Sequence, residues 1–162
     1  MSIVLRRVAA FVIDCGVLAL YAIILFVCSP LLKPLFSYSA SRSELVGFLL
    51  LTLPFGLYFM VSEASKWSAS IGKRLMKLRV VDVKDSRRIH FSQSLLRSAV
   101  KFLPWELAHF AIWHAFVFAS NLQNVAMGAL AVSYFLMVVY LVGLVRKPHR
   151  TFYERISNTK VI

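Results

Sequence analysis

The stretch RRVAAFVIDCGVLALYAIILFVC, which runs from Arg6 to Cys28, decides the class of fold to which this chain belongs. From residue 8 to residue 28 it is apolar except for a single acid, Asp14. A helix that crosses the hydrocarbon core of a bilayer needs about 20 mostly apolar residues. The stretch therefore predicts a transmembrane helix with a carboxylate inside it.

The composition of the whole chain supports a membrane environment. Of the 162 residues, 59% are hydrophobic and only 16% are charged, and the mean hydropathy is +0.72. A soluble domain of this length needs more polar residues to cover its surface. Because no Pro-, Gly- or Ser-rich linker divides the chain, the sequence predicts one all-α integral membrane domain over residues 1–162.

Four apolar segments are expected to span the membrane, over residues 8–28, 45–61, 100–119 and 125–145 approximately. The second is short, and Pro54 is expected to kink it. The third has Pro104 in its expected first turn and carries several polar residues, namely Lys101, Glu106, His109 and His114. Its assignment as a span therefore depends on the distribution of charge.

Positive charge lies almost entirely on one side of this arrangement. With four spans and both termini cytoplasmic, 17 of the 19 Lys and Arg residues face the cytoplasm, and only Lys33 and Arg42 face outward. Cytoplasmic loops carry such an excess of Lys and Arg. We therefore expect a multi-pass protein of the cell (plasma or inner) membrane. The net charge of +12 is explained by topology and by anionic headgroups at the cytoplasmic face, and nucleic acid is not an expected partner.

The cytoplasmic segment between the second and third spans has structure of its own. Leu75–Lys77 is expected to end a short interfacial helix. The β-branched stretch Leu78–Val83, a turn, and Arg87–Phe91 together predict a small β-hairpin. Ser92 is then expected to cap an amphipathic helix that leads into the third span.

In this order, the landmarks resemble the RDD family of membrane proteins, named for one arginine and two aspartates. Its first helix begins with an Arg-Arg pair followed by Ala and Ile-Asp. A Gly-Lys-Arg-Leu turn, a Val-Val-Asp strand and a further arginine come later. The matching positions are Arg6, Arg7, Asp14, Gly72, Lys73, Arg74, Asp82 and Arg97. The resemblance implies a role in transport, with ion/proton antiport for some members.

The end of the chain departs from the family pattern. Tyr153-Glu154 stands where the family usually has His-Asp, so the second aspartate of the pattern corresponds either to Asp82 or to the position of Glu154. Residues 159–162 are β-branched in part and are expected to add a strand beside the hairpin. That strand would bring Glu154 near Lys73 or Arg74.

The role of Asp14 can be functional or structural. A charged group inside a bilayer is costly, so this acid should be protonated, paired or in contact with water. Arg7 lies two helical turns earlier on the same face and would tune its pKa. Asp14 is then either a proton or cation site, or a structural group that fastens the first helix to a neighbour.

The third span offers Glu106 and His109, which are three residues apart and share a helix face, whereas His114 turns away from it. With Asp14 they form a candidate proton relay, and the alternative is hydrogen bonding between helices. A Glu-x-x-His pair also occurs in di-metal bundles, but those contain two such pairs. Since only one is present here, no metal or cofactor is expected.

Two functions remain open. The first is a transporter of a cation or small solute coupled to protons, working as a homo-oligomer because four spans are few for alternating access. The second is a membrane adaptor or assembly factor whose basic cytoplasmic face binds a partner or anionic lipid. An enzyme is not expected, because the sequence shows no nucleophile–base pair and no phosphate-binding loop.

Overall fold

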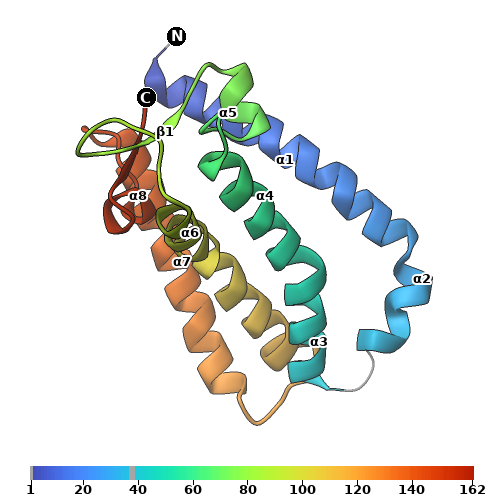
Figure 1. The fold of residues 1–162 in the computed structure, drawn as a ribbon. Helices are drawn as coiled ribbons and strands as arrows, with labels where there is room; N and C mark the ends of the chain where they lie inside the picture. The colour runs from blue at the N-terminus through green and yellow to red at the C-terminus, as the bar shows by residue number, and fades with distance from the viewer. Residues whose placement is uncertain (1, 37–38) are drawn as a thin grey trace.

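A computed structural model describes residues 2–36 and 39–162 and shows a mostly helical chain (Figure 1). The elements in chain order are α1 (Ile3–Val27), α2 (Ser29–Leu32), the 3₁₀-helix η1 (Lys33–Phe36), α3 (Ala40–Gly47), the π-helix η2 (Phe48–Thr52), α4 (Leu53–Ala64), α5 (Ile71–Leu75), β1 (Val80–Asp82), α6 (Phe91–Ala111), the π-helix η3 (Ile112–Val117), α7 (Gln123–Val145), α8 (Phe152–Ile156) and β2 (Thr159–Val161).

Within residues 2–36 and 39–162, three helices are long and apolar enough to cross a membrane. They are α1, the continuous helix Ala40–Ala64 formed by α3, η2 and α4, and α7. Large apolar side chains of α1 and α7 are exposed, among them Phe11, Leu20, Phe135 and Leu141. Contiguous apolar surface of this kind is found where a bilayer covers a protein. The prediction of a membrane protein built from apolar helices is therefore confirmed.

The third predicted span, residues 100–119, belongs to one long helix that consists of α6 continued by η3. This helix begins at Phe91, earlier than the expected start of the span, and it is not among the three apolar helices because it carries Arg97, Lys101 and Glu106. Figure 1 shows α6 between α4 and α7, and it packs on both. Its polar side chains can thus be covered by neighbouring helices.

Two prolines interrupt the backbone hydrogen bonding of these helices, and two tyrosines compensate. Because proline has no N–H, Pro104 leaves the carbonyl of Val100 free, and the hydroxyl of Tyr140 donates to it at 2.5 Å. Tyr21 likewise donates to the Leu50 carbonyl, four residues before Pro54, at 2.8 Å. Buried carbonyls in a membrane need such partners.

The position of Pro104 corrects the sequence analysis. It lies inside α6 rather than in a first turn, because the amphipathic helix and the apolar segment form one continuous helix. The helix N-cap is His90, whose N–H donates to Gln93 Oε1 at 2.9 Å. Ser92, the predicted cap, therefore lies within the first turn.

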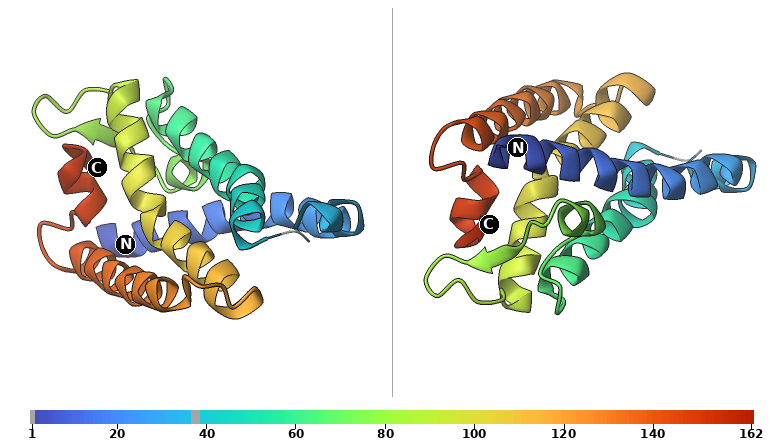
Figure 2. Two further views of the ribbon diagram at one scale, coloured as in Figure 1. Left: turned by 90° about the horizontal axis from the view of Figure 1, so that it is seen from below. Right: turned by 90° about the horizontal axis from the view of Figure 1, so that it is seen from above.

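The two termini lie at the same end of the molecule, together with α5, α8 and both strands (Figures 1 and 2). We call this the basic end, because α5, the loop after β1 and the segment 146–150 before α8 are rich in Lys and Arg. The opposite end holds α2, η1 and the loop before α7, and we call it the far end.

The strands pair antiparallel, with Val80 opposite Val161 and Asp82 opposite Thr159. The predicted C-terminal strand is thus confirmed. The predicted hairpin is reduced to a turn, because Val81 makes a single bridge to Arg88 and the chain enters α6 soon afterwards. The main partner of β1 comes from the end of the chain instead.

Candidate functional site

Asp14 is buried at the basic end, where three donors surround its carboxylate. The hydroxyl of Tyr58 donates to Oδ1 at 2.8 Å, the hydroxyl of Ser70 donates to Oδ2 at 2.6 Å, and the backbone N–H of Gly72 donates to Oδ1 at 2.8 Å. These donors come from α4, from Ser70 at the N-cap of α5 and from the first turn of α5. The carboxylate therefore binds the start of α5 to α1.

Gly72 allows the two helices to touch. A Cβ atom at this position would lie 2.1 Å from the Ala10 carbonyl oxygen, a separation that real Cβ atoms do not show. The backbone of α5 thus rests directly on the backbone of α1. This contact explains why glycine, within the family motif Gly72-Lys73-Arg74, occupies this place.

Arg6 holds the other end of α5. Its guanidinium donates to the Met76 carbonyl, at 3.0 Å from Nε and 2.6 Å from Nη2, and to the Lys77 carbonyl at 2.7 Å. The last carbonyls of a helix need donors and favour positive charge. Arg74 points outward instead, with its guanidinium 4.5 Å from the Trp67 ring centre.

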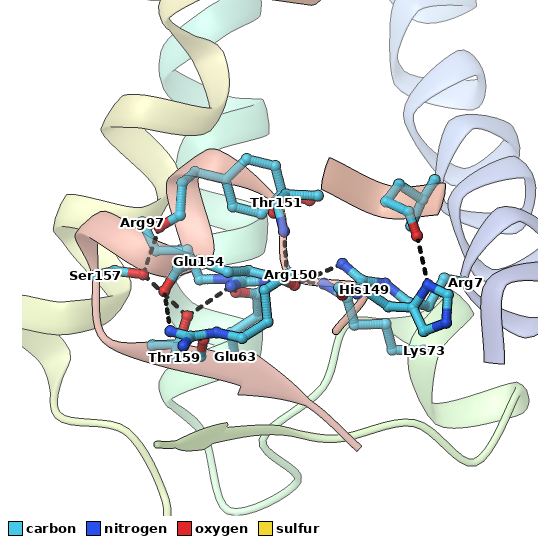
Figure 3. Close-up of polar contacts among 12 residues, drawn as sticks. Arg7, Glu63, Lys73, Arg97, His149, Arg150, Thr151, Glu154, Ser157 and Thr159 are labelled. Atoms are coloured by element: carbon cyan, nitrogen blue, oxygen red, sulfur yellow. Dashed lines mark hydrogen bonds and ion pairs between the residues drawn. The ribbon is translucent and has the colours of Figure 1, made fainter. Parts of the chain in front are cut away.

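Next to this contact lies a buried network of five charged side chains, shown in Figure 3. Arg97 is 1% exposed, and it pairs with Glu63 at 2.7 Å and with Glu154 at 3.3 Å. Arg7 pairs with the same Glu154 oxygen at 2.6 Å, and Lys73 pairs with Glu63. The network joins α1, α4, α5, α6 and α8.

Glu154 is the member of this network that connects the C-terminal segment to the other helices. Burial by itself raises the pKa of its carboxyl, but the charges of Arg97 and Arg7 outweigh burial and hold that pKa below its ordinary value. Oε2 also accepts the Thr151 N–H at 2.8 Å. Glu154 pairs with Arg97 of α6 and Arg7 of α1, whereas Lys73 pairs with Glu63, so the expected approach of Glu154 to Lys73 or Arg74 stays a prediction.

Asp82, the alternative acidic position of the family pattern, has a different environment. It lies on the surface of the sheet, where Gln93 Nε2 donates to it at 2.5 Å and the Lys84 N–H donates at 2.7 Å. These hydrogen bonds lower the pKa of Asp82. The buried ion pairs thus involve Glu154, whereas Asp82 caps a turn.

A second polar cluster lies farther along the bundle, around Glu106 and His109 on α6. The Thr52 hydroxyl donates to Glu106 Oε1, and Trp105 Nε1 donates to Thr52 Oγ1 at 3.1 Å. His109 Nδ1 lies 3.6 Å from Glu106 Oε1 and, among the described residues, has no hydrogen-bond partner. A shift of about 0.5 Å would bring the two within hydrogen-bond distance.

His109 also faces a cavity. The cavity has a volume of about 800 Å³ and lies between α1–α2 and the two π-helices, with Leu25, Phe36, Leu51 and Trp113 in its wall. Single π-helical turns inside α-helices are frequent at functional sites. An acid–histidine pair thus adjoins an apolar space large enough for a small solute.

The structure divides the predicted relay into two places. Glu106 and His109 lie together as expected, whereas Asp14 and Arg7 belong to the basic end and have other partners. Sequence reasoning missed Glu63, although its position at the end of an apolar helix, before a highly basic segment, was a signal. Within the described residues, no group of three or more His, Cys, Asp or Glu side chains is arranged to hold a metal ion.

Comparison with known proteins identifies the family of this chain. The model of the RDD family matches residues 2–158, which is nearly the whole chain. No curated protein and no solved structure matches it. The chain belongs to the RDD family.

Proposed function

We propose that this RDD-family protein moves a cation or a small solute across the membrane in exchange for protons bound at Glu106 and His109. The observation that carries the proposal is the proximity of these two side chains, 3.6 Å between Nδ1 and Oε1, at the wall of the apolar cavity. Ionisable groups inside a membrane protein are rare and commonly mark ion or proton pathways.

The proposal includes four membrane crossings, with α6 and η3 as the third and both termini in the cytoplasm. Two contacts support this topology, because they cover polar groups of α6. Glu106 accepts from Thr52, and the Lys101 ammonium lies 3.1 Å from the centre of the Phe59 ring. The gathering of Lys and Arg at the basic end supports a cytoplasmic position for that end.

In this proposal Asp14 and Arg7 have a structural role, which is to join helices at the basic end, and they do not carry protons. Asp14 accepts three hydrogen bonds and Arg7 is paired with Glu154, so both are committed to joining helices. The cation or solute would occupy the cavity beside His109. Because four helices are few for alternating access, we propose that the protein works as a homo-oligomer in the cell membrane.

A second candidate, the adaptor, rests on the exposed loop after β1. The Arg87 side chain is 85% exposed and only loosely paired with Asp85, at 3.7 Å. Exposed cations beside a bilayer attract anionic headgroups or an acidic partner. Neither candidate includes an enzymatic reaction, a cofactor or nucleic acid.

Proteoliposomes with an interior pH dye, given pulses of Na⁺, K⁺ or Li⁺, test the transport proposal. We expect proton flux with the native chain and its loss in Glu106→Gln, with an unchanged gel-filtration profile. Asp85→Asn is the matched control, since it removes an exposed acid and should leave the flux unchanged. Absence of flux with the native chain would overturn transport and favour the adaptor, whose binding to anionic vesicles should weaken in Arg87→Gln.

A further inference from the structure

A second acid–histidine pair lies at the far end of the molecule. His114, in η3, is 3% exposed, and its Nε2 lies 3.2 Å from Oε2 of Glu44 in α3. Its Nδ1 lies 2.9 Å from Oγ of Ser120, in the loop before α7. The Glu44 side chain is 31% exposed, so one side of the pair reaches the surface while the imidazole is buried.

Ser120 can serve either tautomer of His114. Its Oγ lies 2.9 Å from His114 Nδ1 and 3.2 Å from the His114 carbonyl, and it accepts the Leu122 N–H at 3.3 Å. Because a hydroxyl rotates, Ser120 can donate its hydrogen to Nδ1, or it can donate to the carbonyl and accept a hydrogen from Nδ1.

The arrangement can accept one further proton without losing a contact. When the Ser120 hydroxyl donates to Nδ1, a neutral ring donates Nε2–H to the Glu44 carboxylate, which lies 3.2 Å away. When the hydroxyl turns and accepts from Nδ1, the ring carries hydrogens on both nitrogens and is an imidazolium paired with the carboxylate. The pair can therefore take up or release one proton while both neighbours of the ring stay in place.

We propose that His114 and Glu44 form the outer proton-binding site, through which the Glu106–His109 pair exchanges protons with the outer aqueous phase. This inference rests on the proposed transport function. His109 and His114 are five residues apart where α6 continues into the π-helix η3, so a proton that leaves one pair has the other as the next acceptor along the helix.

Among the described residues, the elements that carry or pack on the pair contribute few other titratable or charged groups. From α3 it faces Glu44, with Arg42 on the same short helix, and from α6 it has His109 as the titratable neighbour. The ring of Phe110 lies 4.5 Å from that of His114. Helix α7, which packs on η3, contains no charged residue in its sequence.

Two measurements test the site. In proteoliposomes with the inside and outside pH set separately, Glu44→Gln should slow proton flux by about tenfold or more and remove its dependence on outside pH. The dependence on inside pH should remain. Glu106→Gln serves as the comparison, because it should abolish flux whichever side is varied. A Glu44→Gln protein with the native dependence on outside pH would overturn the proposal.

The second measurement does not depend on transport. In the protein labelled with ¹⁵N-histidine, the Nδ1 and Nε2 signals of His114 should change with pH as the ring takes up or releases its proton, and this change should be altered in Glu44→Gln. Signals independent of pH in the native chain would overturn the site. If the native chain shows this titration but no flux, the proposed transport fails and the proton site stands.

Discussion

Arg6 and Asp14 hold opposite ends of the same short helix. Asp14 accepts the Gly72 N–H at the start of α5, and Arg6 donates to the Met76 carbonyl just beyond its end. Each charge lies at the end of α5 that its sign favours. The carboxylate inside the first apolar stretch is thus explained, because it fastens a cytoplasmic segment to α1.

Gly72→Ala should destabilise the fold by about 1–3 kcal/mol, because the new Cβ would overlap the Ala10 carbonyl and push α5 away from α1. Denaturant unfolding in detergent, followed by circular dichroism, measures the loss. Gly16→Ala is the matched control on α1, since nothing lies within 4 Å of a Cβ there. Equal stability of the two variants would show that α5 does not rest on α1.

Glu154→Gln should cost about 3–5 kcal/mol, because it leaves the buried charge of Arg7 without its carboxylate and leaves Arg97 to share Glu63 with Lys73. Arg155→Gln, next in sequence and exposed, should change stability little. Limited proteolysis provides a second readout, since α8 and β2 should be cut faster in the first variant only. Similar digestion of both variants would contradict the role of Glu154 in docking the C-terminal segment.

The sequence predicted the parts of this fold that depend on local pattern. Long apolar stretches became helices, and the β-branched end of the chain became a strand beside residues 80–82. The partners of charged residues could not be predicted in the same way. The donors to Asp14 lie more than 40 residues away in sequence, on segments that only packing brings to α1.

His114 shows a second reason why side-chain contacts could not be predicted from the sequence. Regular helical spacing predicted that it turns away from the face of Glu106 and His109, and named no partner for it. The π-helical turns of η3 change that spacing, and the ring packs against Glu44 and Ser120. A π-helix depends on how neighbouring helices fit together, so the sequence alone gave little sign of this contact.

The pH dependence of stability should reflect the ionised state of Glu154. Because Arg97 and Arg7 hold its folded-state pKa below its ordinary value, the carboxylate contributes its full stability above about pH 4.3. That contribution is lost as the pH falls through the folded-state pKa. Thermal unfolding between about pH 3 and 7 should therefore show that stability falls more steeply with decreasing pH in the native chain than in Glu154→Gln. Parallel curves would contradict this prediction.

The register of the small sheet predicts a specific disulfide. Val80 lies directly opposite Val161, and the flanking residue pair Arg79–Ile162 exchanges both backbone hydrogen bonds. The Val80–Val161 pair is therefore the non-hydrogen-bonded kind, in which side chains lie closest. In a background with Cys15→Ser and Cys28→Ser, the variant Val80→Cys with Val161→Cys should form a disulfide on mild oxidation. Val81→Cys with Val161→Cys should form it slowly, and the reverse order of rates would show a different register.

The two tyrosine–carbonyl contacts should be worth more than ordinary surface hydrogen bonds, because each one satisfies a carbonyl that a proline has left free. Tyr140→Phe removes the donor to the Val100 carbonyl and should cost about 1 kcal/mol in detergent unfolding.

Pro104→Ala restores a backbone N–H four residues after Val100, so the hydroxyl of Tyr140 then becomes dispensable. In that background, Tyr140→Phe should cost much less than in the native chain. A double-mutant cycle with both substitutions measures the difference as a coupling free energy. Additive costs would mean that Tyr140 stabilises α6 and α7 through ring packing, on Phe152 and Tyr153, rather than through the carbonyl that Pro104 leaves free.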